Sequence, residues 1–391
     1  MGYKIKDIIK YLWAAKIRWG LPKKSQVLCF DSTGNEYLMP YFKKWNPTEL
    51  NINQSKLEIF ILIAILSVFE KGRYLESYGD AFIKIVKPKL IISHIDNSIN
   101  FWLISQKHPS VKTIIIQNGL RTFHDPFVQS ILAENLVTTK FQVDYMFTLG
   151  NSIGLEYKKH VRAEYIPLGG LKNNAIPKVY DKEEGSIIFI SQFRGLNDIF
   201  KFDSETITGE QFFELSDQVI ISHLVSYAKR KKKSFHIATY NMAVEQDRSL
   251  QEEIAYYNRL AGESLDYKIR KDLASSYEAV DKAEVVVTID STIGYESAVR
   301  GNKTAFFSIR GSQLQKKGYD FGWPAQINKN GSFWTNEANK MNFENILNYL
   351  FDLTQKGWEE ELIKNNFEEY ICYDPGNSKF KTKIDKIMSD K

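Results

Sequence analysis

The chain has 391 residues, of which 43% are hydrophobic and 25% are charged, and its formal net charge is +5. This length suggests two domains, each able to bury its own core. The modest charge and the lack of a recognisable motif argue against a dedicated nucleic-acid-binding protein. Two distant cysteines, Cys29 and Cys372, fit a reducing compartment without a disulfide framework. The six histidines form no zinc-binding pattern, and no D-x-D run is present, so we expect no metal and no cofactor.

Residues 1–24 combine basic and large apolar side chains. Seven Lys or Arg residues accompany a single acid, Asp7, and Trp13 and Trp19 lie among isoleucines and leucines. This pattern predicts a basic amphipathic helix suited to an anionic membrane surface. The alternative is a first helix that packs on the protein body with its basic side in water. The most apolar run, 57–69, is too short to span a bilayer and predicts a buried helix.

The remainder of the first half reads as repeated strand–helix units. Expected strands cover 25–31, 89–95, 113–116, 144–149 and 165–167, and expected helices cover 57–71, 74–86 and 99–107. The strands are apolar without strict alternation, which is typical of a parallel sheet buried on both faces. This region, 25–170, is therefore predicted to be a Rossmann-like domain.

A polar, turn-rich stretch, 171–185, predicts a linker, after which the strand–helix rhythm begins again. Expected strands cover 186–191, 234–240, 265–269, 285–289 and 304–307, and expected helices cover 209–229, 244–262 and 275–283. A second Rossmann-like domain over 186–342 follows from this rhythm, and 343–391 predicts a helical tail. The fold class is α/β, with two domains facing each other across a cleft.

The segment 283–309 carries the strongest functional signal. An apolar strand runs into Asp290, Ser291 and Thr292, and a helix follows with Glu296 in its second turn and Gly301 as its stop. The free N–H groups and positive dipole at such a helix start suit a phosphate. Glu296 is close enough to the same end to accept hydrogen bonds from sugar or ribose hydroxyls. The plainer interpretation is that Ser291 only caps an ordinary helix.

The carboxyl ends of the other strands supply further polar side chains, because ligands of open α/β sheets bind there. The candidates from the first domain are His94, Asp96, Asn97, Gln117, Asn118 and Arg121, and those from the second are Ser191, Gln192, Arg194, Tyr240, Asp290, Ser291, Thr292 and Glu296. His94 and Asp96 are candidate catalytic bases, with His124 and Asp125 as alternatives. Arg194 is a candidate for stabilising the departing phosphate. The other first-domain residues are assigned to substrate and the other second-domain residues to the donor nucleotide.

The run Asp290, Ser291, Thr292, Glu296, Ser297 and Gly301 resembles the donor-site segment of GT-B glycosyltransferases, particularly those of bacterial surface polysaccharides. Gln117-Asn118-Gly119 is similar to the Q-H-G turn of surface-polysaccharide transferases and of the glycerophosphate transferases of teichoic acid synthesis. Those families have a histidine where this chain has Asn118, and an amide cannot take up a proton at neutral pH. The resemblance therefore leaves the catalytic base unassigned.

Together these observations predict a metal-independent glycosyltransferase that uses a nucleotide sugar and a glycan or lipid-linked glycan acceptor. We expect it in the cytoplasm, with peripheral binding to the inner face of the plasma membrane. The alternatives are a sugar-nucleotide 2-epimerase of the same architecture, a CDP-polyol phosphotransferase and a non-enzymatic scaffold with a degenerate GT-B fold. The donor sugar, the linkage and the stereochemical course stay open.

Overall fold

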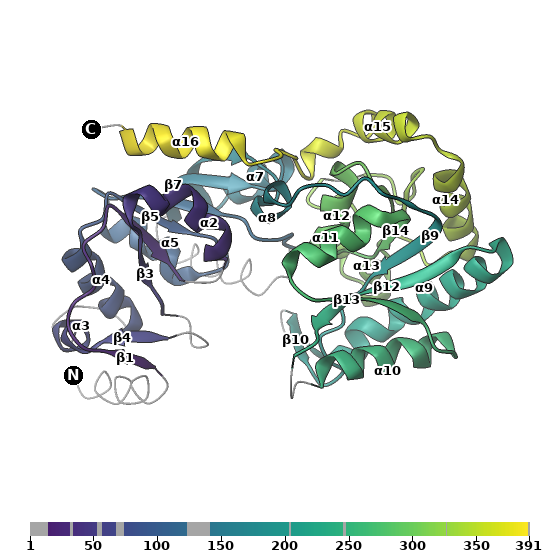
Figure 1. The fold of residues 1–391 in the computed structure, drawn as a ribbon, viewed down its shortest axis with the longest axis horizontal. Coiled ribbons are helices and arrows are strands. Elements are labelled where there is room, and N and C mark those ends of the chain that lie inside the picture. Colours follow the sequence, from purple (N-terminus) through teal and green to yellow (C-terminus); the bar gives the residue numbers. More distant parts are fainter. Residues whose placement is uncertain are drawn as a thin grey trace.

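The computed structural model describes residues 15–31, 34–52, 57–67, 74–122, 141–202, 205–244, 248–325 and 327–389. Within these ranges the chain forms two parallel six-stranded sheets, one in each half of the molecule (Figure 1). Helices cover both faces of each sheet, and the two halves lie side by side (Figure 1), with residues 120–122 of the first half reaching the second. The expected fold class, two Rossmann-like domains, is confirmed.

The first sheet has the strand order β3-β2-β5-β6-β7-β8. Its strands are β2 (Val27–Phe30), β3 (Thr48–Leu50), β5 (Leu90–Ser93), β6 (Lys112–Ile116), β7 (Phe141–Thr148) and β8 (Val161–Pro167), and its helices are α2 (Asn35–Phe42), η1 (Lys43–Trp45), α4 (Tyr74–Val86), α5 (Ile99–Lys107) and α7 (Asn151–Lys158). The chain reverses direction across the sheet between β2 and β5, which makes a switch point at their carboxyl ends.

Successive residues of these strands enter separate cores, as a sheet covered on both faces requires. Val27 and Cys29 pack in the core formed with α2, while Leu28 and Phe30 pack in the core that includes α4 and α5. All four side chains are buried, with at most 1% exposure. The expected helices over 74–86 and 99–107 are confirmed at their exact bounds.

The second sheet has the order β13-β12-β9-β14-β15-β16, with its switch point between β9 and β14. Its strands are β9 (Glu183–Ile190), β12 (Ser234–Met242), β13 (Asp266–Arg270), β14 (Ala283–Thr288), β15 (Lys303–Phe307) and β16 (Trp334–Thr335), and a small hairpin is formed by β10 (Ile199–Phe202) and β11 (Glu205–Thr208). The helices are α9 (Gly209–Lys231), α10 (Ser249–Ala261), α11 (Leu273–Lys282), α12 (Thr292–Val299), α13 (Arg310–Leu314), η3 (Lys317–Tyr319) and α14 (Lys340–Asp352). Capping boxes at Thr208 and Asp272 fix the starts of α9 and α11.

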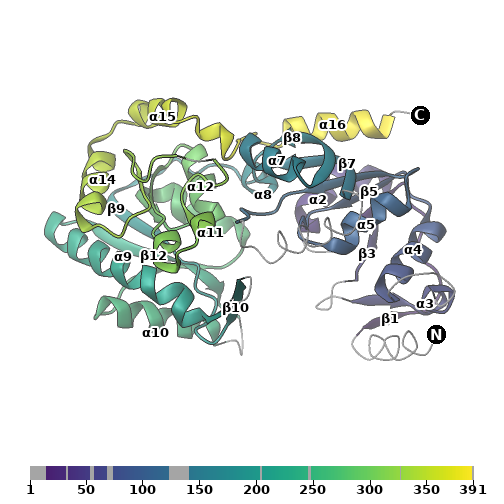
Figure 2. The same ribbon diagram turned by 180° about the vertical axis from the view of Figure 1, so that it is seen from behind.

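The C-terminal segment joins both domains. Helix α14 packs against β15, α15 (Gln355–Lys364) and η4 (Phe367–Glu369) follow it, and α16 (Ser378–Ser389) returns to the first domain (Figure 2). Phe380 of α16 packs edge-on against Phe147, with ring centroids 4.9 Å apart. The C-terminal helix α16 is therefore packed on the first domain, next to β7. Within the expected linker, Leu171–Ala175 form the short helix α8, and β9 already begins at Glu183.

The prediction for the N-terminal region is wrong where it can be checked. Residues 1–14 lie outside the described residues, and Lys16–Arg18 form strand β1, paired in parallel with β4 (Glu58–Phe60). Because of the same pairing, the helix expected over 57–71 begins only at Ile61, in α3 (Ile61–Ser67); residues 68–71 lie outside the described residues. Short apolar runs fit a strand as well as a helix, so periodicity alone did not separate the two. Among the described residues, no helix is long and apolar enough to cross a membrane.

Candidate functional site

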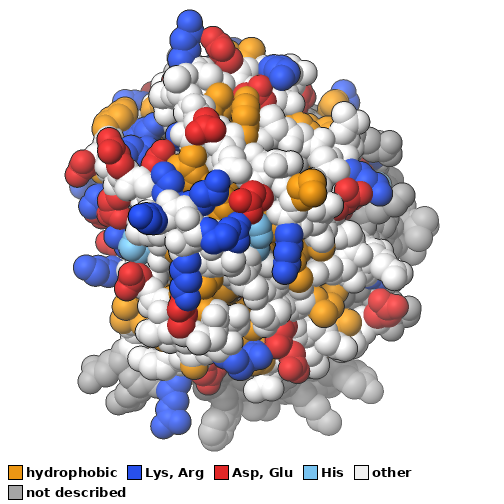
Figure 3. Space-filling model, turned by 90° about the vertical axis from the view of Figure 1, so that its right-hand side faces the viewer, with side chains coloured by type: hydrophobic (Ala, Val, Ile, Leu, Met, Phe, Trp, Pro, Cys, Tyr) orange, Lys and Arg blue, Asp and Glu red, His pale blue; other side chains and the backbone are white. Residues whose placement is uncertain are grey.

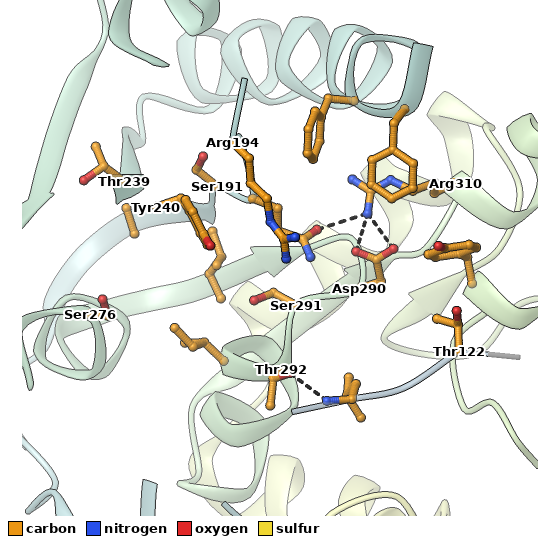
Figure 4. Close-up of a pocket in the computed structure, with 18 of the residues that line it drawn as sticks. Thr122, Ser191, Arg194, Thr239, Tyr240, Ser276, Asp290, Ser291, Thr292 and Arg310 are labelled. Atoms are coloured by element: carbon orange, nitrogen blue, oxygen red, sulfur yellow. Dashed lines mark hydrogen bonds and ion pairs between the residues drawn. The ribbon is translucent and has the colours of Figure 1, made fainter. Parts of the chain in front are cut away.

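A cavity of about 400 Å³ lies at the switch point of the second sheet and is closed on one side by the first domain (Figure 4). The second domain contributes the ends of β9, β12 and β14, together with α9 and α13, and the first domain contributes residues 120–122. Of the residues expected to form the site, the structure places Ser191, Gln192, Arg194, Tyr240, Asp290, Ser291, Thr292 and Arg121 in its walls.

The labelled residues follow one another across the cavity (Figure 4). Thr239, Tyr240 and Ser276 lie at one end, Arg194 and Ser291 lie in the middle, and Asp290 and Arg310 lie at the other end with Thr122. Arg194 and the start of α12 therefore lie in the middle of the cavity, between these two ends (Figure 4).

The start of α12 provides the central anion-binding geometry. Ser291 is the N-cap residue, yet its hydroxyl makes no capping hydrogen bond to the first turn. The helix lies close to its preceding strand because position 294 is glycine: a Cβ there would approach the side chain of Thr288 to 2.4 Å. A helix start directly after a strand at a switch point is a favourable phosphate site. The role expected for Ser291 remains a prediction.

Thr292 has a different environment from the one expected. Its Oγ1 accepts a hydrogen bond from the backbone N–H of Leu120 at 3.0 Å. This bond crosses from the second domain to the first. Thr292 therefore links the domains in this state, in addition to lining the cavity.

Arg194 is exposed and extends over the ring of Tyr240, with its guanidinium carbon 5.7 Å from the ring centroid. Within the described part of the chain it makes no ion pair, so its charge is directed at the cavity. Tyr240 is fixed from behind, because the buried carboxylate of Glu253 accepts the N–H of Tyr240 at 2.8 Å and that of Asn241 at 2.9 Å.

A buried arginine that the sequence analysis did not single out completes the far end. Arg310 Nη1 lies 2.5 Å from both carboxylate oxygens of Asp290 and 3.3 Å from Gln192 Oε1. Arg310 lies three residues after the end of β15. The expectation that ligands bind at the carboxyl ends of the strands therefore applies to Arg310 as well.

The structure does not bring Asp96 to the cavity as a base. Asp96 is fully buried and accepts hydrogen bonds from Arg121 Nε at 3.0 Å, Arg121 Nη2 at 2.5 Å and the Tyr157 hydroxyl at 2.8 Å. A carboxylate so occupied positions Arg121, which does line the cavity. Asp96 therefore holds Arg121 in this structure and does not itself line the cavity, and its catalytic role stays a prediction.

His94 also lies outside the cavity walls. It is 3% exposed, and burial, assisted by the charge of Lys172, lowers its pKa to about 4. A Cβ at Gly34 would come within 2.3 Å of its Nδ1, so the loop backbone closes tightly over the ring. His94 is thus a neutral, enclosed histidine in this state. The alternative bases, His124 and Asp125, lie outside the described residues.

The remaining first-domain candidates brace the loop instead of facing the cavity. Gln117 accepts the N–H of Leu149 at 3.0 Å and donates to the carbonyl of Gly119 at 2.9 Å. Asn118 accepts from Arg121 Nη2 at 2.7 Å. Asn97 is exposed and does not line the cavity. Of the residues predicted from this loop, Arg121 lines the cavity, whereas Gln117 and Asn118 do not.

Glu296 is buried beside the linker and does not line the cavity. It accepts the Tyr277 hydroxyl at 2.8 Å, and a Cβ at Gly170 would come within 1.9 Å of its Oε1. Burial raises the pKa of Glu296 from 4.5 to about 7. The helix start lies over the cavity, but one turn later the same helix faces the junction between the domains.

Glu296→Gln should therefore change the pH dependence of stability. Since its pKa is raised on folding, the native state holds more protons than the unfolded state between about pH 4.5 and 7, and stability falls as pH rises through that window. We expect the variant to be more stable than the wild type at pH 8, by up to about 3 kcal/mol, and close to it at pH 5. Urea denaturation at both pH values measures this. A difference between the proteins that does not depend on pH would contradict it.

No group of three or more His, Cys, Asp or Glu side chains in the described ranges is placed to hold a metal ion. The positive groups of the cavity lining are arginine side chains and the start of α12.

Comparison with known proteins places the chain in a family. A family model described as "putative O-antigen biosynthesis protein" matches residues 114–388, which is more than half of the chain. A search of curated proteins returns no match.

Among solved structures, a "putative UDP-N-acetylglucosamine 2-epimerase" from Listeria monocytogenes is similar at 12% identity, covering 93% of this chain and 96% of its own, with a TM-score of 0.54. An alanine variant of the wall teichoic acid polymerase TagF is similar at 13% identity, covering 99% and 93%, with a TM-score of 0.50. At these identities the similarity establishes the two-domain fold alone. The extent of the family match is what decides membership: the chain belongs to this O-antigen biosynthesis protein family and has the GT-B fold.

Proposed function

We propose that the protein is a glycosyltransferase that transfers a sugar from a nucleotide-sugar donor to a glycan acceptor during surface-polysaccharide synthesis. The carrying observation is the cavity at the β9–β14 switch point, where Arg194 and the start of α12 meet between the two domains. A switch point with a helix start and a cation is a general design for binding a phosphorylated ligand.

The proposed donor lies along the cavity, with its phosphates at Ser291 and Arg194 and its base toward Tyr240. The acceptor approaches from the first-domain loop that carries Arg121 and Thr122. In this proposal the transfer is metal-independent, because Arg194 and the α12 dipole meet the charge that develops on the leaving phosphate. Family membership in O-antigen biosynthesis supports a polysaccharide product.

A 2-epimerase is the strongest alternative within the same fold, and its acid–base chemistry needs paired proton carriers at the sugar. Within the described lining the cavity has one carboxylate, that of Asp290, and no histidine. This composition favours transfer over epimerisation. A non-enzymatic scaffold would not need an exposed arginine in this lining, and Arg194 has no ion pair with any of the described residues.

A thermal-shift screen against CMP, CDP, UDP, GDP and their sugars tests the proposal, because a ligand that binds the native state raises its melting temperature. We expect one nucleotide series to stabilise the protein. The selected donor is then incubated with and without a glycan acceptor. Nucleotide release that depends on acceptor supports transfer, whereas a change in the donor sugar without acceptor supports the epimerase. Lack of stabilisation by every nucleotide would support the scaffold.

We also propose peripheral binding to an anionic membrane through the β1–β4–α3 end of the first domain. Apolar side chains there are more than 40% exposed: Ile17, Trp19, Leu21, Leu62, Ile65 and Leu66. Lys16 is exposed in β1, and Lys23 and Lys24 are exposed in the segment that follows this strand. In contrast, the view from the second-domain end shows charges of both signs intermingled and hydrophobic side chains in small, separate spots (Figure 3).

Replacing Trp19 and Leu21 with serine should weaken binding to anionic vesicles about tenfold or more, because each side chain loses an apolar insertion worth roughly 1.5–3 kcal/mol. Flotation with anionic and with zwitterionic vesicles measures this. Leu155→Ser on α7 is the control, since Leu155 is 63% exposed but lies away from this end. Equal flotation of the double variant and the wild type would remove this surface from the proposal.

A further inference from the structure

We propose that Asp290, held by Arg310, forms the subsite for the transferred group of the donor, and that this group is an uncharged, polyhydroxylated sugar. The inference rests on the proposed function and names its substrate class. The Asp290–Arg310 pair lies at the end of the cavity opposite Tyr240, and Arg194 and Ser291 lie between this pair and Tyr240 (Figure 4). A nucleotide sugar has the same order of parts: base, phosphates, sugar.

The carboxylate, and not the guanidinium, faces the ligand. Arg310 is 1% exposed as a residue, whereas the side chain of Asp290 is 15% exposed. The Arg310 guanidinium lies against Phe212, its carbon 4.5 Å from the ring centroid, and its Nε and Nη2 are enclosed without a hydrogen-bond partner. Arg310 is thus a positioning residue, fixing both Asp290 oxygens through Nη1.

The charge balance disfavours an anionic transferred group. The positive charge of Arg310 is offset by Asp290 at 2.5 Å, so this pair offers no net positive charge to a ligand. A carboxylate or phosphate entering here would meet Asp290 first and be repelled. The hydroxyls of a neutral sugar can instead donate to a carboxylate, forming charge-assisted hydrogen bonds.

The surrounding wall fits a sugar ring. Phe200 is stacked on Phe212 with centroids 4.3 Å apart, and Tyr319 lies 5.7 Å from Phe212; all three line the cavity. Because Phe200 and Arg310 occupy the two faces of Phe212, the aromatic surface proposed for the sugar is that of Phe200 and Tyr319. Sugar rings are amphipathic, so a flat aromatic surface beside a carboxylate meets both their C–H and O–H faces. Thr122 from the first domain lies at the same end, where an acceptor would meet the transferred group.

Asp290→Asn tests the assignment, because the amide keeps the shape but loses one acceptor and the charge. Calorimetric titration compares the selected nucleotide with a neutral and an acidic sugar carried on it: UDP with UDP-glucose and UDP-glucuronic acid, GDP with GDP-mannose and GDP-mannuronic acid, or, for cytidine, CDP with CDP-glucose and CMP with CMP-N-acetylneuraminic acid. We expect wild type to prefer the neutral sugar over the acidic one. The variant should bind the neutral nucleotide sugar about tenfold more weakly, as for loss of a charged hydrogen bond, with nucleotide affinity changed less than about twofold.

Asp290→Asn leaves Arg310 without its counter-charge, so this variant could fail to fold. Phe200→Leu is the second variant for that case. We expect Phe200→Leu to lower the affinity for the nucleotide sugar and to leave the affinity for the nucleotide unchanged. Equal losses for nucleotide and nucleotide sugar would overturn the subsite, as would tighter wild-type binding of the acidic sugar. If the wild-type protein binds no nucleotide, both the proposed function and this subsite are overturned. If the wild type binds the nucleotide and neither variant loses affinity specifically for the nucleotide sugar, only the subsite is overturned and the proposed function stands.

Discussion

Replacing Asp281 with alanine should lower the free energy of unfolding by about 3–5 kcal/mol, since it leaves a buried arginine without its counter-charge. The side chains of Asp281 and Arg300 are both fully buried. Arg300 donates to the carboxylate through Nε at 3.0 Å and through Nη2 at 2.5 Å. Among the ion pairs described, this one has the least access to water on both sides.

The pair also fixes the segment between the domains. Arg300 donates to the carbonyls of Asn173, Ile176 and Pro177 at 3.0–3.1 Å, and Asp281 accepts the N–H of Val179 at 3.0 Å. The linker is therefore attached to α11 and to the end of α12. Losing the carboxylate removes part of this attachment as well as the charge.

Urea denaturation followed by circular dichroism measures the effect. Glu360→Ala is the control, because Glu360 pairs with Lys356 on the surface and exposed pairs contribute little. Replacing both partners, with Asp281→Leu and Arg300→Met, should restore only the part of the loss that comes from the unpaired charge, because the linker groups that the pair binds stay without these partners. If the single alanine variant is as stable as the control, the buried pair does not have the role assigned to it.

Much of the fold was predictable because strands buried on both faces leave a plain pattern of apolar runs between helices. Strand–helix alternation located the strands that carry the site. The β1–β4 pair was missed because a three-residue strand has too few residues for its periodicity to show.

The site was predictable only where a local rule sufficed. Ser191, Asp290 and Ser291 follow strands on either side of the switch point, and parallel strands bring those ends together. Asp96 follows a strand too, but the return of Arg121 to cover it is a tertiary contact that no spacing shows. Glu296 was misplaced because a helix that starts at the cavity turns its next face elsewhere.

Replacing Arg194 with alanine should lower the turnover number for sugar transfer about 100- to 1000-fold, the loss seen when one preorganised donor to a developing negative charge is removed. Arg194 lines the middle of the cavity, between Tyr240 and Asp290, where the proposed leaving phosphate lies. Its charge is not consumed by a carboxylate within the described part of the chain, so it can respond to charge that builds up on the phosphate.

Two comparisons separate this role from plain substrate binding. Arg194→Lys keeps the charge but loses the planar fork that grips two phosphate oxygens, so its turnover should be intermediate. Arg259→Ala is the control, because Arg259 pairs with Glu214 on an exposed surface, at 2.9 Å. Steady-state nucleotide release, with the donor that the thermal-shift screen selects, measures both turnover and KM. A variant that raises KM while leaving turnover unchanged would show that Arg194 binds the ground state and the transition state equally, and would assign the leaving-group role to another residue.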